Sequence, residues 1–511
     1  MERYPGKQLF IDDFFIEELR GARRVLNQPQ KQTVSGPLAM PCGYPWSQPG
    51  RVVYDENQRV FHHFYGAEIA GEQRICIQHS HDGFSWQRPS LGLVEVDGGR
   101  DNNITNCPPG GMAIFWDPHA EDEDYRWKRI DNKPQGQGAD GEPVWMAFHS
   151  RDGCDWRAYP PGPHNDQQML FNFGSPHETF GGSVDPDARY VWYSQRGSSR
   201  RTRVLGRRDS PDGLNWSGLR TVIDQDLGDP PGSEFYAAGF DVANRSEGGL
   251  RVLMLDVFHT DLREPYLIDN PAAYWGGEKG GRALAARIDG VVEAQLAVSR
   301  DTVAWTRFRE PFIARGAPGA WDWGAVYADG PILHDGQLYF FYNGHSLTHN
   351  GRAPQLWQQP YASEDRRGKG LALLRVDGYV SVEAESYAPG VLTTHRFRQE
   401  RGGRVQVNVD AAAGKLRYEL LEDNGAPIPG YTAAECDPIR GDELAAELSW
   451  QGRKGWPPLG DARRAAVPGL SEHDFYVKLR FCIAPGTKLY SLTIDPPEVT
   501  QWQVQLRGRI D

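Results

Sequence analysis

The sequence of 511 residues lacks the segments that would attach it to a membrane or export it. It has no run of about 18 apolar residues, the length that spans a bilayer. Its N-terminus, Met-Glu-Arg-Tyr-Pro-Gly-Lys, has no apolar core of the kind found in signal peptides. We therefore expect no membrane partner and a cytoplasmic location; a trimmed periplasmic or secreted chain would show the same features.

Cysteine is also scarce, and acidic residues outnumber basic ones. The six cysteines are scattered and form no Cys-x-x-Cys pair, so we expect buried free thiols, no metal site and no cofactor. The 56 Lys and Arg residues face 68 Asp and Glu residues, which gives a formal net charge of −12, and no basic stripe occurs. Nucleic acid is therefore not an expected partner.

Residues that form turns and strands are abundant. The chain has 58 Gly, 37 Pro and 11% aromatic residues. This composition suits many short strands joined by tight turns and does not suit long helices. We therefore expect an all-β protein.

A repeated Ser-x-Asp-Gly-x-x-Trp motif divides the chain. Its Ser and Asp side chains are expected to bind nearby backbone amides in a tight turn, with Gly at positive φ and Trp packed between sheets. We assign this motif no chemistry. The copies are 80–86, 150–156, 210–216, 299–305 without the Gly, and a degenerate 375–381.

Each copy follows a hairpin of two predicted strands. The hairpins are 50–65, 111–130, 182–195, 239–258 and 330–342. Five such repeats predict a five-bladed β-propeller over 46–385. The tail, 386–511, alternates like half-buried strands at 404–409, 415–421, 476–481 and 489–494, and predicts a C-terminal β-sandwich. Residues 1–45 are expected to form an arm with one strand, 8–15, that stands alone or completes a blade or the sandwich.

Residues just before the five hairpins should converge, because the innermost strands of a propeller begin around its axis. Four of these five junctions carry a carboxylate, and paired carboxylates are what glycosidic cleavage requires. Glu234 is the expected proton donor, and the expected nucleophile or base is one of Asp101, Glu178 and Asp329.

Aromatic, amide and imidazole side chains near the same junctions are candidate sugar ligands, because rings stack on sugars and amides bind hydroxyls. The candidates are Trp46, Asn102, Asn103, His177, Tyr236, His259, Trp323, Tyr327 and His345. Three further acids are less favoured. Asp185 aligns with a hairpin turn, and Asp12 and Asp13 fit a solvated strand edge.

The chain resembles the five-bladed propeller glycosidases, which include the family 32 β-fructosidases and the family 43 arabinosidases and xylosidases. The opening 8–17, Asp101-Asn102-Asn103-Ile104 and Glu234-Phe235-Tyr236 are similar to a bacterial branch labelled family-32-like. The resemblance covers nearly the whole chain and implies a glycoside hydrolase with Glu234 as its acid.

Several departures from that family limit the substrate prediction. The sequence has no Asn-Asp-Pro-Asn-Gly and no Arg-Asp-Pro, and Phe235 stands where fructosidases have Cys. The Ser/Asp turns also resemble those of sialidases, but no junction carries an Arg. The leading hypothesis is thus a glycosidase for a furanoside or other small glycoside or oligosaccharide. The alternatives are a non-catalytic carbohydrate-binding propeller, a sialidase-like hydrolase and a protein-docking scaffold; the sugar, linkage, stereochemistry and oligomeric state stay open.

Overall fold

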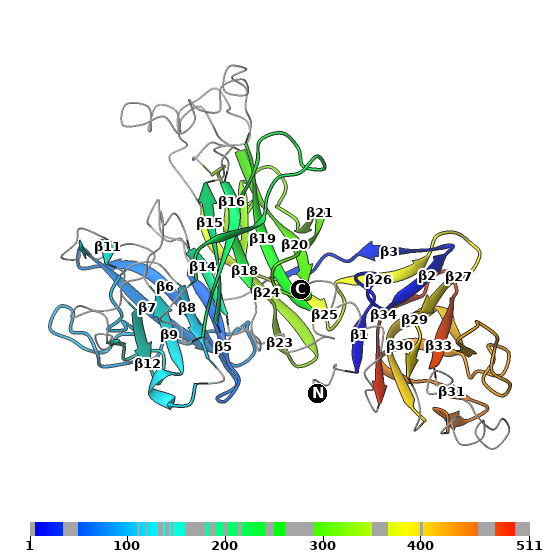
Figure 1. Cartoon of the computed structure of the whole chain (residues 1–511). Helices are drawn as coiled ribbons and strands as arrows, with labels where there is room; N and C mark the ends of the chain where they lie inside the picture. Colours follow the sequence, from blue (N-terminus) through cyan, green and yellow to red (C-terminus); the bar gives the residue numbers. More distant parts are fainter. Residues whose placement is uncertain are drawn as a thin grey trace. The chain divides into compact units, whose positions relative to one another are not determined.

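The computed structural model divides the chain into two compact units. The large unit comprises 28–244 and 251–373, and the C-terminal unit comprises 1–27, 245–250 and 374–511. The residues described are 6–33, 50–109, 113–117, 120–130, 136–137, 143–144, 147–159, 179–183, 190–197, 203–211, 217–240, 250–260, 290–349, 366–398, 402–457 and 476–495. Within these ranges the only helix is a short 3-10 turn, Glu123–Tyr125, so the all-β prediction is confirmed (Figure 1).

Five antiparallel groups of strands follow one another in the large unit, and we call them sheets 1 to 5. Sheet 1 comprises β5 (Arg51–Asp55), β6 (Val60–Ile69) and β7 (Glu72–Ser80). Sheet 2 comprises β8 (Ala113–Trp116), β9 (Trp127–Ile130), β12 (Ala147–Ser150) and β13 (Arg157–Ala158). Sheet 3 comprises β14 (Thr179–Ser183), β15 (Tyr190–Gly197), β16 (Arg203–Ser210) and β17 (Arg220–Ile223).

The last two sheets share one parallel bridge, between Val292 and Ala325. Sheet 4 comprises β18 (Ser233–Phe240), β19 (Arg251–Thr260), β20 (Gly290–Ser299) and β21 (Thr306–Ile313). Sheet 5 comprises β22 (Ala325–Ala328), β23 (Ile332–His334), β24 (Gln337–His345), β25 (Arg367–Arg375) and the N-terminal β4 (Gln30–Gln32). A separate small hairpin pairs β10 (Gly136–Gln137) with β11 (Pro143–Val144).

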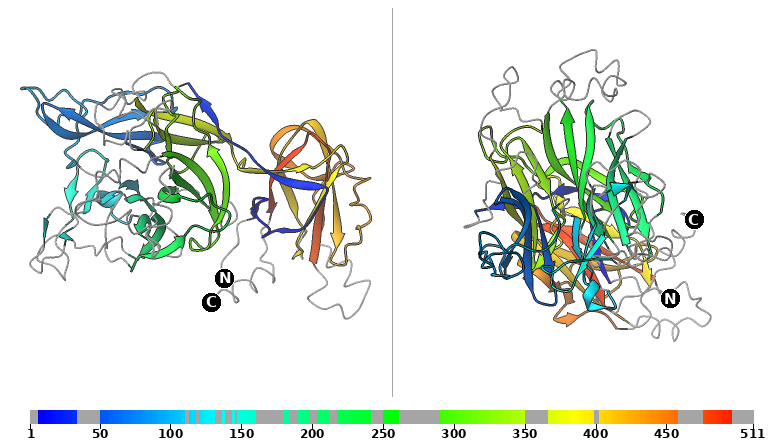
Figure 2. Two further views of the ribbon diagram at one scale, coloured as in Figure 1. Left: turned by 90° about the horizontal axis from the view of Figure 1, so that it is seen from above. Right: turned by 90° about the vertical axis from the view of Figure 1, so that its left-hand side faces the viewer.

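The first strands of successive sheets lie next to each other. β5 contacts β8, β8 contacts β14, β14 contacts β18, and β18 contacts β22. Sheet 5 returns to sheet 1, because the Lys369 ammonium donates to the Gly50 carbonyl at 2.9 Å. The sheets therefore contact one another in chain order around a common centre (Figure 2, left).

Neighbouring sheets share apolar cores. Phe64 of sheet 1 packs with Trp127 of sheet 2, and Leu205 of sheet 3 packs with Leu255 of sheet 4. Each such buried side chain contributes about 1.5–3 kcal/mol relative to an exposed one. Cys76, Cys107, Cys154 and Cys436 are buried free thiols, as expected from the sequence.

The Ser/Asp turns are the structural devices that the sequence predicts. In the first copy the Ser80 hydroxyl accepts from the Gly83 amide at 2.8 Å, and Asp82 accepts from the Phe84 and Ser85 amides at 2.8 and 2.7 Å. Gly83 has φ +76°, and the Trp86 indole donates to its carbonyl at 3.1 Å. The copies at 150–156 and 299–305 repeat this pattern. Residues 212–216 of the third copy lie outside the described residues.

Removing one of these turn acceptors should lower stability without touching the site. We expect Asp82→Ala to lose about 1 kcal/mol of unfolding free energy, comparable to losing a helix cap, because two amides lose their acceptor. Thermal unfolding measures this loss. Asp82→Asn, which keeps an acceptor oxygen, is the control, and an equal loss in both variants would contradict the explanation.

A buried histidine, His62, contacts the half-buried His79 at the boundary of sheets 1 and 2. His62 is 3% exposed, and its ring lies 4.6 Å from that of His79 and 4.9 Å from that of Trp127, centroid to centroid. Among the described residues, neither ring nitrogen of His62 has a hydrogen-bond partner. Burial, with a smaller contribution from His79, lowers the pKa of His62 to about 3.

This histidine should make folding sensitive to mild acid. The unfolded chain binds a proton at His62 with a pKa near 6.5, whereas the folded chain does not until about pH 3. Stability is therefore complete above pH 6.5 and falls as the pH drops below it, by about 2 kcal/mol between pH 7 and 5. Urea unfolding at both pH values measures this loss. The same two measurements on His62→Leu should show a pH dependence smaller by that amount, and an unchanged dependence would refute the assignment.

The C-terminal unit is built on one continuous, nearly closed sheet. Its strands are β1 (Lys7–Leu9), β2 (Ile16–Arg20), β3 (Ala22–Leu26), β26 (Val380–Ala384), β27 (Gly390–Thr394), β28 (Phe397–Arg398), β29 (Arg404–Glu422), β30 (Ile439–Glu447), β33 (Tyr476–Ile483) and β34 (Lys488–Asp495). The main path is β2-β27-β33-β29-β34-β26-β3, and a small hairpin pairs β31 (Ser449–Trp450) with β32 (Arg453–Lys454).

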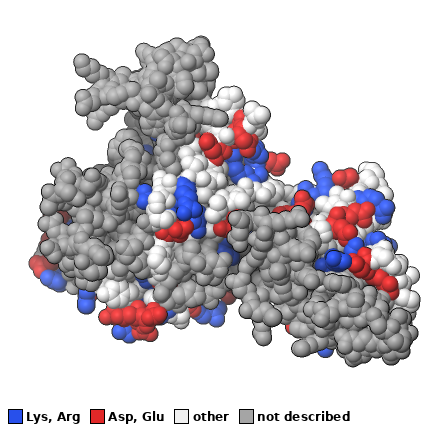
Figure 3. Space-filling model, in the orientation of Figure 1, with Lys and Arg blue, Asp and Glu red and all other residues white. Residues whose placement is uncertain are grey.

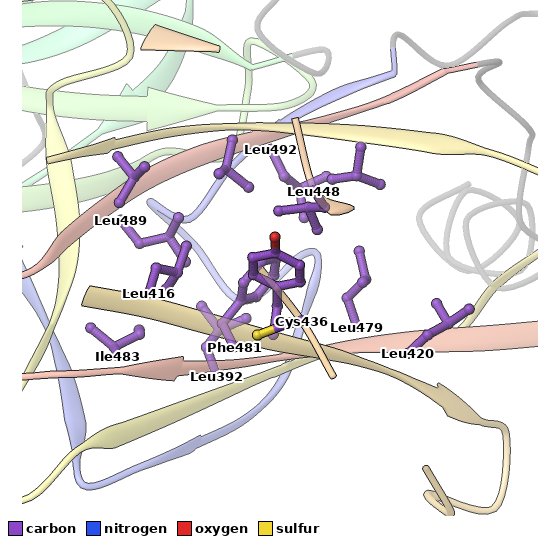
Figure 4. Packing of buried hydrophobic residues seen from close by; sticks show 14 of the residues in the cluster. Leu392, Leu416, Leu420, Cys436, Leu448, Leu479, Phe481, Ile483, Leu489 and Leu492 are labelled. Atoms are coloured by element: carbon purple, nitrogen blue, oxygen red, sulfur yellow. The ribbon is translucent and has the colours of Figure 1, made fainter. Parts of the chain in front are cut away.

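The long strand β29 curves this sheet around its core. Its first part pairs with β34, from Arg404 opposite Asp495, and its last part pairs with β33, from Leu416 opposite Ile483. Leucines from these strands fill the space between them (Figure 4). All four tail segments predicted as strands lie in strands, but 404–409 and 415–421 are parts of the single strand β29 rather than two strands. A sandwich of two separate sheets stays a prediction.

The N-terminal segment differs from the expected single strand over 8–15. The chain leaves β1 and turns, because the Asp12 carboxylate accepts from the Phe14 amide at 3.2 Å. Phe10 and Phe15 are both buried in the C-terminal core, which a turn permits and simple strand alternation does not. β3 then pairs with β26, and residues 1–27 and 374–385 both belong to the C-terminal unit, unlike the expected boundaries at 45 and 385.

Candidate functional site

A buried ion pair marks one edge of the large unit, where β16 and β18 begin. The Arg203 guanidinium donates to the Glu234 carboxylate at 2.7 Å, and their side chains are 19% and 5% exposed. Arg203 also lies 4.7 Å from the centre of the Tyr236 ring. An adjacent cation favours the charged form of a buried carboxyl.

His349 connects this pair to sheet 5. Its Nε2 lies 2.9 Å from the Tyr236 hydroxyl, and its Nδ1 lies 3.0 Å from the Tyr327 hydroxyl. Burial, helped by the nearby Arg203 and Arg367 guanidinium groups, lowers the pKa of His349 to about 3. The imidazole is therefore neutral at pH 7.

His345 lies next to this group, at the end of β24. It is 8% exposed, and its ring lies 5.3 Å from that of Tyr327. Burial, followed by the charge of Arg367, lowers its pKa well below 6.5. We call Arg203, Glu234, Tyr236, Tyr327, His345 and His349 the Glu234 cluster.

A second polar pair lies on the other face of sheet 4. Glu234 is paired in register with Phe258, and Ser233 with His259, so Glu234 and His259 project from opposite faces. His259 Nε2 lies 2.9 Å from the Glu293 carboxylate. Burial alone would raise the pKa of Glu293, but the hydrogen bond and charge of His259 hold it below its usual value.

Three other predicted site residues that are described, Asp329, Asn102 and Asn103, have separate partners. Asp329 accepts from the buried Lys369 ammonium at 2.5 Å. Asn102 donates to the Val94 carbonyl and Asn103 to the Tyr65 hydroxyl, so both fix a loop of sheet 1. Asp101 is exposed in that loop.

Trp323 accepts, through its carbonyl, a hydrogen bond from Arg315 at 2.6 Å. The structure thus brings together Glu234, Tyr236, Tyr327 and His345, and places His259 on the opposite face. Trp46, His177, Glu178 and Asp185 lie outside the described residues.

The sequence analysis did not select Arg203, His349 or Glu293. Arg203 and Glu293 lie in the third strands of sheets 3 and 4, and His349 lies in the segment after β24. In an antiparallel sheet, a third strand starts at the same edge as the first strand. Extending the search from the first strands to the starts of the third strands would have found Arg203 and Glu293.

No metal or membrane feature accompanies the cluster. Within the described ranges, no group of three or more His, Cys, Asp and Glu residues could hold a metal ion, and no helix is long and apolar enough to cross a membrane. Acidic and basic side chains lie in mixed groups on the face shown in Figure 3. Sheet 4 also has a buried pair of opposite charges, in which Arg307 lies 2.7 Å from Asp229.

Comparisons with known proteins found similarity in structure alone. No family model matches the chain, and no curated protein matches it. It is similar to a solved structure described as a glycoside hydrolase (TM-score 0.40, 14% identity, covering 68% of this chain and 92% of that one). It is also similar to a GH32 beta-fructofuranosidase from Bombyx mori (TM-score 0.37, 11% identity, covering 92% and 94%).

A third similar structure is an N-acetylgalactosamine deacetylase from F. plautii in complex with blood group B trisaccharide. Its TM-score is 0.39 and its identity 16%, and the match covers 71% of this chain and 96% of that one. TM-scores of 0.40 or less at such identities decide neither fold nor function, so the assignment of function depends on the Glu234 cluster.

Proposed function

We propose that the chain is a glycoside hydrolase whose five sheets are the blades of a propeller and whose reaction takes place at Glu234. The observation that carries this proposal is the carboxylate of Glu234, almost fully buried, paired with Arg203 and adjacent to Tyr236. Hydrolysis of a glycosidic bond requires a carboxylate placed against the sugar ring, either to attack it or to activate water.

We propose a role for Glu234 other than the proton donor that the sequence suggests. A proton donor must hold a proton at neutral pH, whereas the guanidinium of Arg203 favours the ionised carboxylate. We therefore assign Glu234 as nucleophile or base rather than acid. Asp101 and Glu178 stay candidates for the second carboxyl, and Asp329 is less favoured because Lys369 already binds it.

The neighbouring aromatic residues fit a sugar substrate. Tyr236 and Tyr327 contribute rings and hydroxyls to the cluster. Rings provide stacking faces for sugars, and hydroxyls exchange hydrogen bonds with them. We propose a furanoside or another small glycoside or oligosaccharide as substrate.

A panel of aryl glycosides tests this function. It should include fructosides, arabinofuranosides, galactofuranosides, pyranosides and sialosides, with release of the aryl group as the readout. Release from at least one class supports the proposal. Binding of the sugars without release would replace it by the carbohydrate-binding alternative, and release from sialosides alone would favour the sialidase-like one.

A further inference from the structure

His349 bridges two neighbouring sheets next to Glu234. Its ring nitrogens contact the hydroxyls of Tyr236, on β18, and Tyr327, on β22, at 2.9 and 3.0 Å. Its backbone amide donates to the Gly290 carbonyl at 3.0 Å, and its ring lies 4.9 Å from that of Phe258. Contacts to three strands and one aromatic ring therefore fix the orientation of the imidazole.

A neutral imidazole gives the two tyrosines different roles. It has one N–H donor and one lone-pair acceptor, so one hydroxyl donates to it and the other accepts from it. The accepting hydroxyl directs its own proton to an acceptor other than His349. Tyr236 is 2% exposed, whereas Tyr327 is partly exposed, so Tyr327 is the one that a substrate can reach.

We propose that His349 is a positioning residue that orients Tyr327 to donate a hydrogen bond to the substrate. This inference rests on the proposed glycosidase function. This role requires the tautomer in which Nε2 accepts from Tyr236 and the Nδ1 proton is donated to Tyr327. The same imidazole holds Tyr236 against Arg203, which in turn holds Glu234. His349 therefore acts through its neighbours and does not contact the reacting atoms.

Kinetics of variants separates positioning from simple structural support. His349→Phe should lower kcat about 100-fold with little change in KM, because a small misplacement of a reacting group costs that much. His349→Gln, which keeps one donor and one acceptor, should recover at least part of the rate. Tyr327→Phe should lose about as much as His349→Phe, and the double variant should lose no more than either single one.

His149 offers a matched control in sheet 2. It is a buried histidine stacked on Tyr125 at 4.0 Å, and its Nδ1 lies 2.8 Å from the Asp124 carbonyl. His149→Phe should leave kcat unchanged. Equal losses in His149→Phe and His349→Phe, or additive losses for His349 and Tyr327, would overturn the positioning role.

A second readout does not depend on activity. With ¹⁵N-labelled histidine, His349 at pH 7 should show one protonated and one unprotonated nitrogen, and Tyr327→Phe and Tyr236→Phe should each shift a different one. If the wild-type protein cleaves no glycoside but shows these shifts, the proposed glycosidase function is refuted and the bridge of His349 between the two tyrosines is supported. If the wild-type protein is active but the His349 signals stay unchanged in both tyrosine variants, the bridge is refuted and the glycosidase function stands.

Discussion

Glu234→Gln is expected to lower kcat about 10³-fold or more on any glycoside that the wild-type protein cleaves. Glutamine has nearly the same shape, but it can neither attack a sugar ring nor take a proton from water. Losses of roughly 10² to 10⁴ are typical when a group that transfers a proton is removed, and losing a nucleophile costs at least as much. Steady-state kinetics on the best aryl glycoside measures the effect.

A matched substitution controls for the loss of an ion pair. Glu419 is a buried glutamate of the C-terminal unit, and Arg480 donates to it at 3.0 Å, with side chains that are 11% and 26% exposed. Glu419→Gln makes the same chemical change and should leave kcat unchanged. If Glu234→Gln folds with a normal circular dichroism spectrum and keeps its activity, Glu234 is not the catalytic carboxylate.

Much of the fold could be predicted because it is encoded locally. A Ser-x-Asp-Gly-x-x-Trp turn satisfies its own amides within six residues, and therefore looks the same in sequence and in structure. An alternating strand such as β33 is equally local, since from Val477 onward it buries every second side chain. The apolar residues between 8 and 16 resemble a strand in the sequence, and only the burial of both Phe10 and Phe15 in one core, which strand alternation does not allow, reveals the turn.

The site could be predicted only in part, because its members come from distant parts of the chain. Tyr236 and His349 are 113 residues apart, and nothing near either residue indicates the other. Residues at the starts of first strands were found because the repeats align them. Arg203, at the start of a third strand, can be reached by extending the same alignment, whereas His349, in the segment after β24, becomes visible only when the sheets are packed.

Lys369→Met is expected to destabilise the large unit by about 3–5 kcal/mol. The Lys369 side chain is fully buried, and its ammonium donates to Asp329 at 2.5 Å, to Asn343 at 2.9 Å and to the Gly50 carbonyl at 2.9 Å. Methionine has a similar length but leaves the Asp329 carboxylate and two oxygens without this donor. Removing one partner of a buried ion pair costs this much, because the other charge stays buried and uncompensated. Urea unfolding followed by tryptophan fluorescence measures the loss.

The double variant Asp329→Leu with Lys369→Met separates the structural role of this pair from a catalytic one. Replacing both charges by apolar side chains removes the uncompensated charge, so most of the lost stability should return. The contacts of Lys369 join sheet 1 to sheet 5 and do not include Glu234. If the only role of Asp329 is to bind Lys369, the double variant should therefore cleave glycosides at close to the wild-type rate. A double variant that is as stable as the wild type yet has lost its activity would instead make Asp329 the second catalytic carboxyl, as the sequence first suggested.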